Sequence, residues 1–301
     1  HPSETLPWPS SLAEQIALVR GVIDQTGWRP DDGEKVLARH FAVVGTTGVG
    51  KSTAVSLILR KVVEKRPEIR VIVLDPHNEF TTAFADKAIT VDANQLDLPF
   101  WIFKLEEMTE VIFRGREPVA NEVDALRDLI PLAKERYRRA ETGQTGSQLI
   151  KRDRDVTSLT ADTPVPYRIV DLLQLLDDRA GQLDGKADRP HLRALRNRIE
   201  SLINDPRFRF MFGSKTISDT LQPVISHVFR LPQRGKPICV FEMSNLPAEV
   251  VNSVVSVLCR MAFDLALSSD GAIQTLMVCE EAHRYIPSDQ NAGFWPTRQA
   301  I

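Results

Sequence analysis

The feature that most constrains the fold is the segment Gly45-Thr46-Thr47-Gly48-Val49-Gly50-Lys51-Ser52, which fits the P-loop pattern G-x-x-x-x-G-K-S/T. An apolar run at 40–44 precedes it and predicts a buried strand. Residues 53–64 follow it, and their apolar members recur at helical spacing. Because strand, loop and helix in this order are the context in which the pattern binds phosphates, we expect an α/β fold with a nucleotide site at the start of that helix.

The residues of this loop have distinct expected roles. The glycines let backbone N–H groups curve around a phosphate, and the helix N-terminus adds positive potential. Lys51 is expected to reach the β- and γ-phosphates and to assist catalysis, and the Ser52 hydroxyl to bind Mg²⁺. The predicted nucleotide-binding set is Thr47, Gly48, Val49, Gly50, Lys51, Ser52 and Thr53.

A second apolar run ends in two acids. Residues 275–279 have the composition of a buried parallel strand, and Glu280 and Glu281 follow directly. Acids at the carboxyl end of a parallel strand lie where open α/β sheets bind their ligands. We expect Glu280 to hold Mg²⁺ through water, and Glu281 to orient and deprotonate the attacking water. The alternative is that both acids are solvated loop residues, which the P-loop makes the weaker interpretation.

The adjacent acids also indicate the class of P-loop protein. A base immediately after the metal-binding acid is typical of the RecA-like branch, and the chain lacks the Asn-Lys-x-Asp motif that reads guanine. ATP is therefore the expected nucleotide. The predicted fold is α/β: a RecA-like P-loop ATPase core, with a mostly parallel sheet flanked by helices, and a helical insertion.

The pattern along the chain predicts how these parts are arranged. Segment 1–38 is expected to be a linker or the tail of an upstream element, 39–100 and 218–301 the ATPase core, cut short at its C-terminal end, and 101–217 the helical insertion. Further strands are predicted at 69–74, 88–91 and 237–241. Helices are predicted at 12–22, 117–139, 167–176, 191–203 and from 247 to about 267, with a loop or hinge at 142–166.

Composition excludes several classes of protein. The 301 residues carry a net charge of −2, so any contact with nucleic acid must come from local basic patches. The three cysteines form no C-x-x-C pair, which argues against a zinc site or a disulfide framework. We expect no apolar run to approach the roughly 20 residues that cross a bilayer. The chain is therefore predicted to be a soluble, cytoplasmic protein without a membrane partner.

Three motifs together resemble the HerA group of DNA-translocating ATPases, within the HerA and FtsK superfamily. They are the run from His40 to Ser52, the strand end Asp75-Pro76-His77-Asn78-Glu79-Phe80, and Glu280-Glu281-Ala282-His283-Arg284-Tyr285-Ile286-Pro287. Weaker similarities lie at Leu98-Pro99-Phe100-Trp101 and at Ser244-Asn245-Leu246-Pro247. The resemblance covers nearly the whole chain from residue 39.

The resemblance implies a homohexameric ring that threads double-stranded DNA, binds ATP between subunits, and works with a nuclease or another effector in DNA end processing or antiviral defence. Two residues depart from the pattern: Asn78 stands where relatives commonly have Gly, and Glu280 where Asp is commoner. The arginine that reaches the neighbouring subunit's ATP is expected beyond Ile301.

Three further residues are candidates around the nucleotide. Asp75 can support Mg²⁺ or the water indirectly, or simply cap the turn that follows it. His77 and His283 can couple the state of the γ-phosphate to neighbouring subunits, or only pack and hydrogen-bond. Arg284 and Arg298 are weaker candidates for contact with a neighbour's phosphate.

Basic clusters supply candidates for DNA contact, although such clusters are usually solvated helix faces. They are Lys134-Glu135-Arg136-Tyr137-Arg138-Arg139, Lys151-Arg152-Asp153-Arg154, and the trio Arg193, Arg196 and Arg198.

Two functional alternatives remain open. One is a hexameric scaffold that uses ATP to assemble and regulate an effector enzyme without moving DNA. The other is a conjugation or secretion ATPase, which would need a membrane protein as partner.

Overall fold

The computed structural model describes residues 42–46, 48–92, 97–141, 159–182, 189–213, 221–232, 234–270 and 272–284. Thr47, Arg298, the cluster 151–154, segment 1–38 and its predicted helix lie outside these ranges. The elements run in the order α3 (Lys51–Lys65), β1 (Arg70–Asp75), β2 (Ala88–Asp92), η3 (Phe100–Ile102), α4 (Leu105–Phe113), α5 (Ala120–Glu141), α6 (Ile169–Gln182), α7 (Arg189–Ile203), η5 (Pro206–Phe208), α8 (Arg209–Phe212), α9 (Leu221–Val228), β3 (Ile238–Glu242), α10 (Ala248–Ser268), β4 (Thr275–Cys279) and η7 (Ala282–Arg284).

The described strands form one parallel sheet in the order β2-β3-β1-β4. The register pairs Val71 with Ile238 on one side of β1 and with Leu276 on the other. The carboxyl ends of all four strands therefore lie along the same edge of the sheet. This parallel sheet, flanked by helices, confirms the predicted α/β class.

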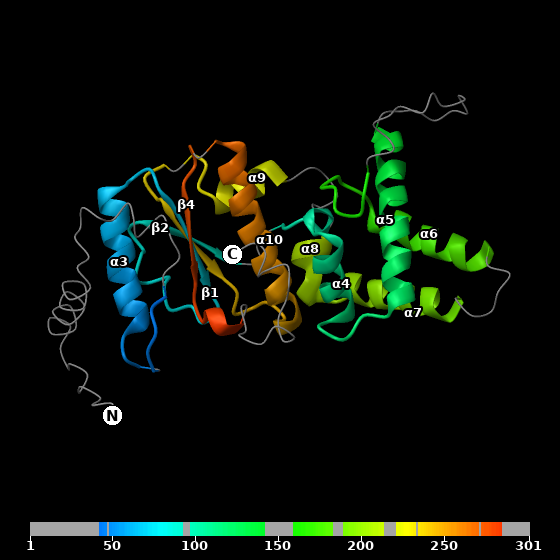
Figure 1. The fold of residues 1–301 in the computed structure, drawn as a ribbon, viewed down its shortest axis with the longest axis horizontal. Coiled ribbons are helices and arrows are strands. Elements are labelled where there is room, and N and C mark those ends of the chain that lie inside the picture. Colours follow the sequence, from blue (N-terminus) through cyan, green and yellow to red (C-terminus); the bar gives the residue numbers. More distant parts are fainter. Residues whose placement is uncertain are drawn as a thin grey trace.

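The two faces of the sheet are covered by different helices, as Figure 1 shows. In β1, Val71 and Val73 pack with Leu59 of α3, whereas Ile72 and Leu74 belong to a second cluster that includes Val254 of α10. Successive side chains of a strand point to opposite faces, so the unbroken apolar sequence of β1 serves both helices.

Helices α4 to α8 lie to one side of the sheet, opposite α3 (Figure 1). Their apolar stripes meet in a core that is continuous with the α10 face of the sheet, because Leu126, Leu172 and Leu195 belong to the same buried cluster as Ile72. Helices α5, α6 and α7 correspond to the helices predicted at 117–139, 167–176 and 191–203, with ends shifted by a few residues. The boundaries proposed for the insertion and the core stay a prediction.

The strand predicted before the P-loop is not found in the described residues. Residues 42–46 have no regular structure, and Val43 and Val44 are 37% and 87% exposed. Apolar composition predicted burial here, but a strand forms only where a neighbouring strand accepts its hydrogen bonds. The described part of the sheet ends at β4, and none of its strands pairs with 42–46.

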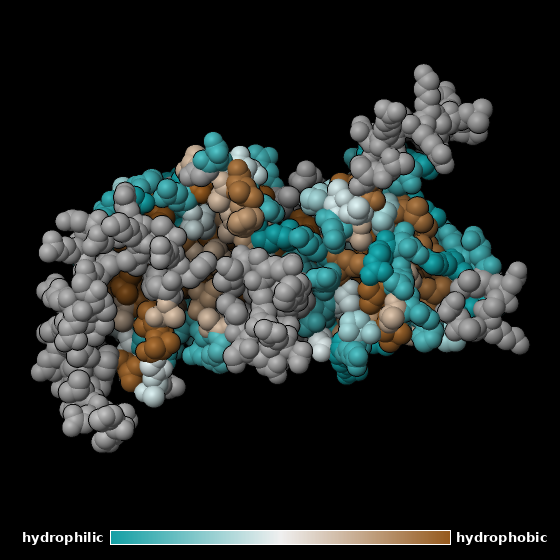
Figure 2. All heavy atoms as spheres, in the orientation of Figure 1, coloured by the Kyte–Doolittle hydropathy of each residue, from teal (hydrophilic) through white to brown (hydrophobic). Residues whose placement is uncertain are grey.

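Helix α10 corrects the expectation about apolar runs. The stretch Val250–Ser268 is long and apolar enough to cross a membrane by length and composition, which is weak evidence because buried core helices pass the same test. More than half of the stretch is buried inside the protein. Figure 2 shows hydrophobic surface over the C-terminal part of this helix, where Phe263 and Leu267 are 58% and 64% exposed. The run is easily overlooked in the sequence because Arg260 and Asp264 interrupt it.

Candidate nucleotide-binding and catalytic site

The described part of the P-loop presents free backbone donors at the start of α3. Gly48 and Gly50 have φ angles of 83° and 86°, a region that favours glycine. Helix α3 begins at Lys51, and Gly50 precedes it without a side-chain cap, so the N–H groups of the first turn have no partner within the helix. Such a helix terminus attracts a phosphate group.

Gly45 is needed for a different reason, which is close packing inside the loop. A Cβ atom at this position would lie 2.7 Å from Cγ2 of Val49. Lys51 closes the same loop, because its Nζ donates hydrogen bonds to the carbonyl oxygens of Gly45 at 3.0 Å and Thr46 at 3.1 Å. The predicted phosphate-binding lysine therefore lies against the loop that would hold the phosphate.

The motif after β1 is brought to the P-loop by Glu79. The Ser52 hydroxyl donates a hydrogen bond to Oε2 of Glu79. The buried Asp75 carboxylate accepts hydrogen bonds from the backbone N–H groups of His77, Glu79 and Phe80, at 3.2, 3.1 and 2.9 Å. Asp75 thus folds the turn that carries Glu79, which is the capping role left open for it.

Glu280 lies next to this group. Its backbone N–H donates to the carbonyl oxygen of Leu74 at 3.2 Å, which continues the β1–β4 ladder by one residue. Burial raises the pKa of the Glu280 carboxyl, and the nearby charges of Glu79, Glu281 and Asp75 raise it further, while Lys51 lowers it. The two predicted catalytic segments therefore meet at the carboxyl edge of the sheet, at the lower end in Figure 1.

Glu281 turns away from the strand direction. Its φ of 51° is unusual for a residue other than glycine and ends the strand abruptly. Its Oε2 lies 3.1 Å from Nδ1 of His283, which is largely exposed. This pair gives the predicted base a specific neighbour.

Asn78 and His77 occupy the outer side of the same turn. Asn78 has a φ of 57°, which explains why Asn can replace the more common Gly here, and its side chain donates to Ser244 Oγ at 3.0 Å. His77 is exposed. Its proposed role in coupling the γ-phosphate to neighbouring subunits stays a prediction.

The donor set fits Mg²⁺ bound together with a nucleotide. Among the described residues, no three His, Cys, Asp or Glu side chains are arranged to hold a metal ion by themselves. Mg²⁺ in nucleotide sites usually has only one or two protein ligands, the rest being waters and phosphate oxygens. Ser52, with Glu280 or Glu79 beside it, offers such oxygens. Burial and, after it, the neighbouring carboxylates raise the pKa of Glu280, and a cation bound there would relieve the repulsion among these carboxylates.

Glu79 is the functional candidate that sequence reasoning missed. Glu79 belongs to the motif Asp75–Phe80 that resembles the family, but the spacing of residues in the sequence does not predict that it contacts Ser52. Glu242, at the end of β3 beside Asp75, was missed too; its Oε1 accepts from Thr81 Oγ1 at 2.5 Å. The signal in the sequence would have been the acid at or directly after the end of three predicted strands, namely Asp75, Glu242 and Glu280. Together they predict an acidic edge of the sheet.

Where the structure describes the predicted basic clusters, several of their residues are engaged within the protein. Lys134 is fully buried, and its Nζ donates to the carbonyl oxygens of Thr160, Ala161 and Thr163, so its candidacy for DNA contact was wrong. Arg136 pairs with Asp178, Arg139 with Glu135, and Arg196 with Asp177 and Glu200. Arg198 lies in a pocket described below.

Comparisons with known proteins place this chain in a family. A profile described as "Helicase HerA, central domain" matches residues 32–262. The DNA double-strand break repair helicase HerA of Pyrococcus furiosus is 45% identical over 49 residues, which cover 16% of this chain and 9% of that protein. The probable DNA double-strand break repair helicase HerA of Methanocaldococcus jannaschii is 38% identical over 53 residues, covering 18% and 10%.

A solved structure shows the same fold. VirB4 of Thermoanaerobacter pseudethanolicus superposes with a TM-score of 0.53 at 14% identity, covering 85% of this chain and 62% of VirB4. At this identity the likeness concerns the fold, and it confirms the predicted RecA-like P-loop core. The chain aligns with a tenth or less of the two HerA proteins. Because the profile spans more than half of the chain and includes the P-loop and the Asp75–Phe80 turn, the protein belongs to the family of the HerA central domain.

Proposed function

We propose that this protein is an ATPase that drives translocation along double-stranded DNA as a subunit of a homohexameric ring. The observation that carries the proposal is the meeting of the P-loop, Glu79 and Glu280 at one sheet edge, seen in the Ser52–Glu79 hydrogen bond and in the hydrogen bond from the Glu280 backbone to Leu74, the residue before Asp75. Membership of the HerA family and the VirB4-like fold support the translocase type.

The roles of the residues follow from their positions. The N–H groups of Gly50, Lys51, Ser52 and Thr53 bind the phosphates of ATP, together with the Lys51 ammonium. Ser52, and Glu280 through water, would hold Mg²⁺, which would neutralise charge on the phosphate oxygens. Glu79 orients Ser52. Glu281 takes the proton of the attacking water, and His283 orients the Glu281 carboxylate.

The biological setting belongs to the same proposal. Work with a nuclease or another effector protein, in DNA end processing or antiviral defence in the cytoplasm, is what the family resemblance favours. The scaffold alternative differs in one measurable respect, which is that DNA would not stimulate hydrolysis.

The test is ATP hydrolysis by the full-length protein, with and without linear double-stranded DNA. The variant Glu281→Gln should bind ATP and lose hydrolysis, because the amide cannot take a proton. Glu141→Gln, an exposed change in α5, is the matched control and should hydrolyse normally. DNA stimulation lost only in Glu281→Gln supports the motor. Hydrolysis that ignores DNA contradicts translocation, and hydrolysis retained by Glu281→Gln contradicts its role as the base.

A further inference from the structure

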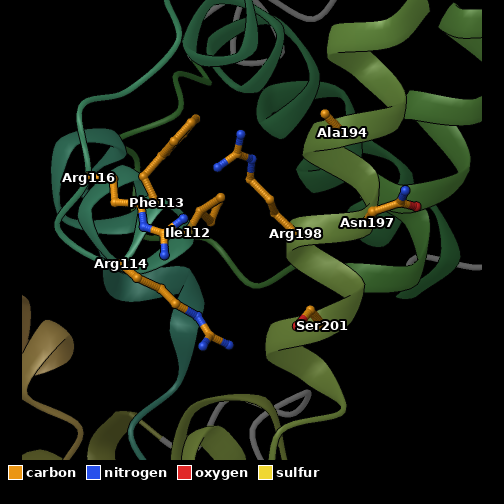
Figure 3. Close-up of a pocket in the computed structure, with 8 residues that line it drawn as sticks. All are labelled: Ile112, Phe113, Arg114, Arg116, Ala194, Asn197, Arg198 and Ser201. Atoms are coloured by element: carbon orange, nitrogen blue, oxygen red, sulfur yellow. The ribbon is translucent and has the colours of Figure 1, made fainter.

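A pocket lined by arginines and by apolar side chains lies in the helical half of the molecule. The pocket, of about 350 Å³, opens between the end of α4 and one face of α7 (Figure 3). Both helices lie on the side of the sheet away from α3 (Figure 1). Its α7 residues are spaced three and four positions apart, so they share one helix face. The lining residues are Ile112, Phe113, Arg114, Arg116, Ala194, Asn197, Arg198 and Ser201.

Three arginines line this pocket, two from the turn after α4 and one from α7. Figure 3 shows their guanidinium groups spread along it, with that of Arg114 toward Ser201 and that of Arg198 at the opposite end. Arg116 is exposed and has no ion-pair partner within the described part of the chain. Arg114 lies 3.4 Å from Asp205, whose carboxylate is held more closely by Arg207 at 2.7 Å. Arg207 is the main reason that the pKa of Asp205 falls to about 2. The Arg114 guanidinium also lies 5.4 Å from the centre of the Phe208 ring, so Arg114 keeps only some of its five donors for a ligand, whereas the exposed Arg116 adds a less engaged guanidinium.

Arg198 is already fixed in position by the protein. Its guanidinium lies 5.0 Å from the centre of the Phe113 ring, and its Nε lies 3.4 Å from Oε2 of the buried Glu122. Neither atom of this ion pair has a well-aligned hydrogen bond among the described residues. Burial raises the pKa of the Glu122 carboxyl, and Arg198 opposes that effect. An arginine held in this way loses little conformational freedom when it binds an anion.

The pocket offers the donors that a phosphate group requires. Guanidinium groups bind phosphate oxygens in pairs, with a planar geometry that lysine lacks. Asn197 and Ser201 lie at the exposed rim and add side-chain donors of the kind that contact nucleic-acid phosphates. Because the rim is exposed, a phosphate that continues into a chain on both sides can enter.

We propose that this pocket binds a backbone phosphate of a nucleic acid. The inference rests on the proposed function only in taking nucleic acid as the partner; the site is separate from the P-loop and needs no ATP. Arg114 and Arg116 supply charge from the turn after α4, Arg198 supplies a positioned guanidinium, and Glu122 holds that guanidinium in place.

The experiment measures binding of the full-length protein to a fluorescent DNA duplex without ATP, over a series of salt concentrations. Arg116→Ala removes an exposed side chain, so folding should be unaffected, as a thermal melt checks. We expect the slope of log affinity against log salt to fall by about 0.9 for each arginine–phosphate interaction that a substitution removes, with weaker binding to all sequences alike. The double variant Arg114→Ala/Arg116→Ala should show about twice this decrease.

Matched controls separate this site from a general loss of charge. Arg127→Ala removes an exposed arginine of α5 whose ion pair is with Asp124, and it should leave the slope unchanged. Arg116→Lys keeps the charge but not the paired geometry, so it should bind between the wild type and Arg116→Ala.

The possible results point in different directions. Unchanged binding by the double variant overturns the inference while leaving the proposed function intact. Displacement of the duplex by low concentrations of AMP or inorganic phosphate also overturns it, because the ligand is then a small phosphate ester. Arginine-dependent binding of single-stranded nucleic acid alone supports the pocket and contradicts the duplex translocase. A wild type that binds no nucleic acid overturns both.

Discussion

At the scale of single residues, the site depends on carboxylates that differ in what they contact. Asp75 is buried and accepts three backbone hydrogen bonds, so it shapes a turn, whereas Glu79 is exposed and contacts Ser52. Two acids four residues apart in one motif thus have separate tasks, one structural and one facing the ligand.

Glu79→Ala should reduce ATP hydrolysis by about 10–100-fold, the usual cost of removing a residue that orients a metal ligand. The reason is that Ser52 loses the carboxylate that accepts its hydrogen bond. The apparent affinity for Mg²⁺ should weaken, while binding of nucleotide without metal changes little. Titration of hydrolysis with Mg²⁺ checks this, with the exposed Glu68→Ala as control. Unchanged Mg²⁺ dependence would show that the hydrogen bond to Ser52 has no part in the reaction.

At the scale of elements, a buried ion pair ties α4 to α10. The Glu107 carboxylate, which is fully buried, accepts hydrogen bonds from Arg260 at 3.0 Å, from Ser256 at 2.7 Å and from the backbone of Lys104 at 2.8 Å. Arg260 also donates to the carbonyl oxygen of Ile102. The helical half is therefore joined to the helix that covers the sheet through a charge as well as through apolar packing.

Glu107→Ala should lower the free energy of unfolding by about 3 kcal/mol, because it leaves the partly buried Arg260 charge with only its 4.0 Å ion pair to Asp264. The double change Glu107→Leu/Arg260→Met should cost much less, since it leaves neither charge behind. Urea unfolding measures both, and the exposed Glu106→Ala is the control. Equal costs for the single and double variants would argue against this account.

Lys134 ties a second pair of elements, because it fastens the turn at 160–163 to α5. Burial lowers the pKa of Lys134 to about 8, and the charge of Asp162 only partly opposes this effect. The Tyr167 ring lies 5.8 Å from the ammonium group. The folded protein thus gives up the proton of Lys134 more readily than the unfolded chain, whose lysines titrate near about 10.4.

The sign of the pH effect follows from this lowered pKa. Between about pH 8 and pH 10.5 the unfolded chain binds more protons at this residue, so its contribution to the free energy of unfolding rises with pH. Below that window the contribution is constant. Lys134→Met should remove this rise, seen as a smaller pH slope in urea unfolding, whereas Lys61→Met, at an exposed site, should keep it. A slope that is the same in Lys134→Met and wild type would contradict the assignment.

At the scale of the whole molecule, the proposed function requires assembly, because it places ATP between the subunits of a ring. With a net charge of −2, one subunit attracts DNA only weakly. In a ring, the phosphate contacts of several copies would add to the affinity for one duplex. We expect light scattering of the full-length protein to show a hexamer with ATP and Mg²⁺, and hydrolysis per chain to rise with protein concentration until the ring is complete. Activity per chain that is independent of concentration, in a protein that stays monomeric, would argue against the ring.

Some of this protein followed from its sequence alone. The P-loop, the acid-ended strand 275–279 and the amphipathic helices were predictable, because glycine spacing and hydrophobic periodicity are local properties of the chain. The helix after Gly50 and the strands at 70–75, 238–242 and 275–279 lie within a residue or two of the prediction.

Other features were decided only by the tertiary structure, because they depend on which segments pair. Apolar residues at 43 and 44 predicted a strand, yet no described strand pairs with them. Lys134 looked like a surface cation, and the fold buried it against three carbonyl oxygens. The hydrogen bond between residues 52 and 79, and the arginine pocket shared by the turn after α4 and by α7, join side chains that no sequence period relates. Periodicity determines which face of an element is apolar, but only packing determines what that face and its polar neighbours meet.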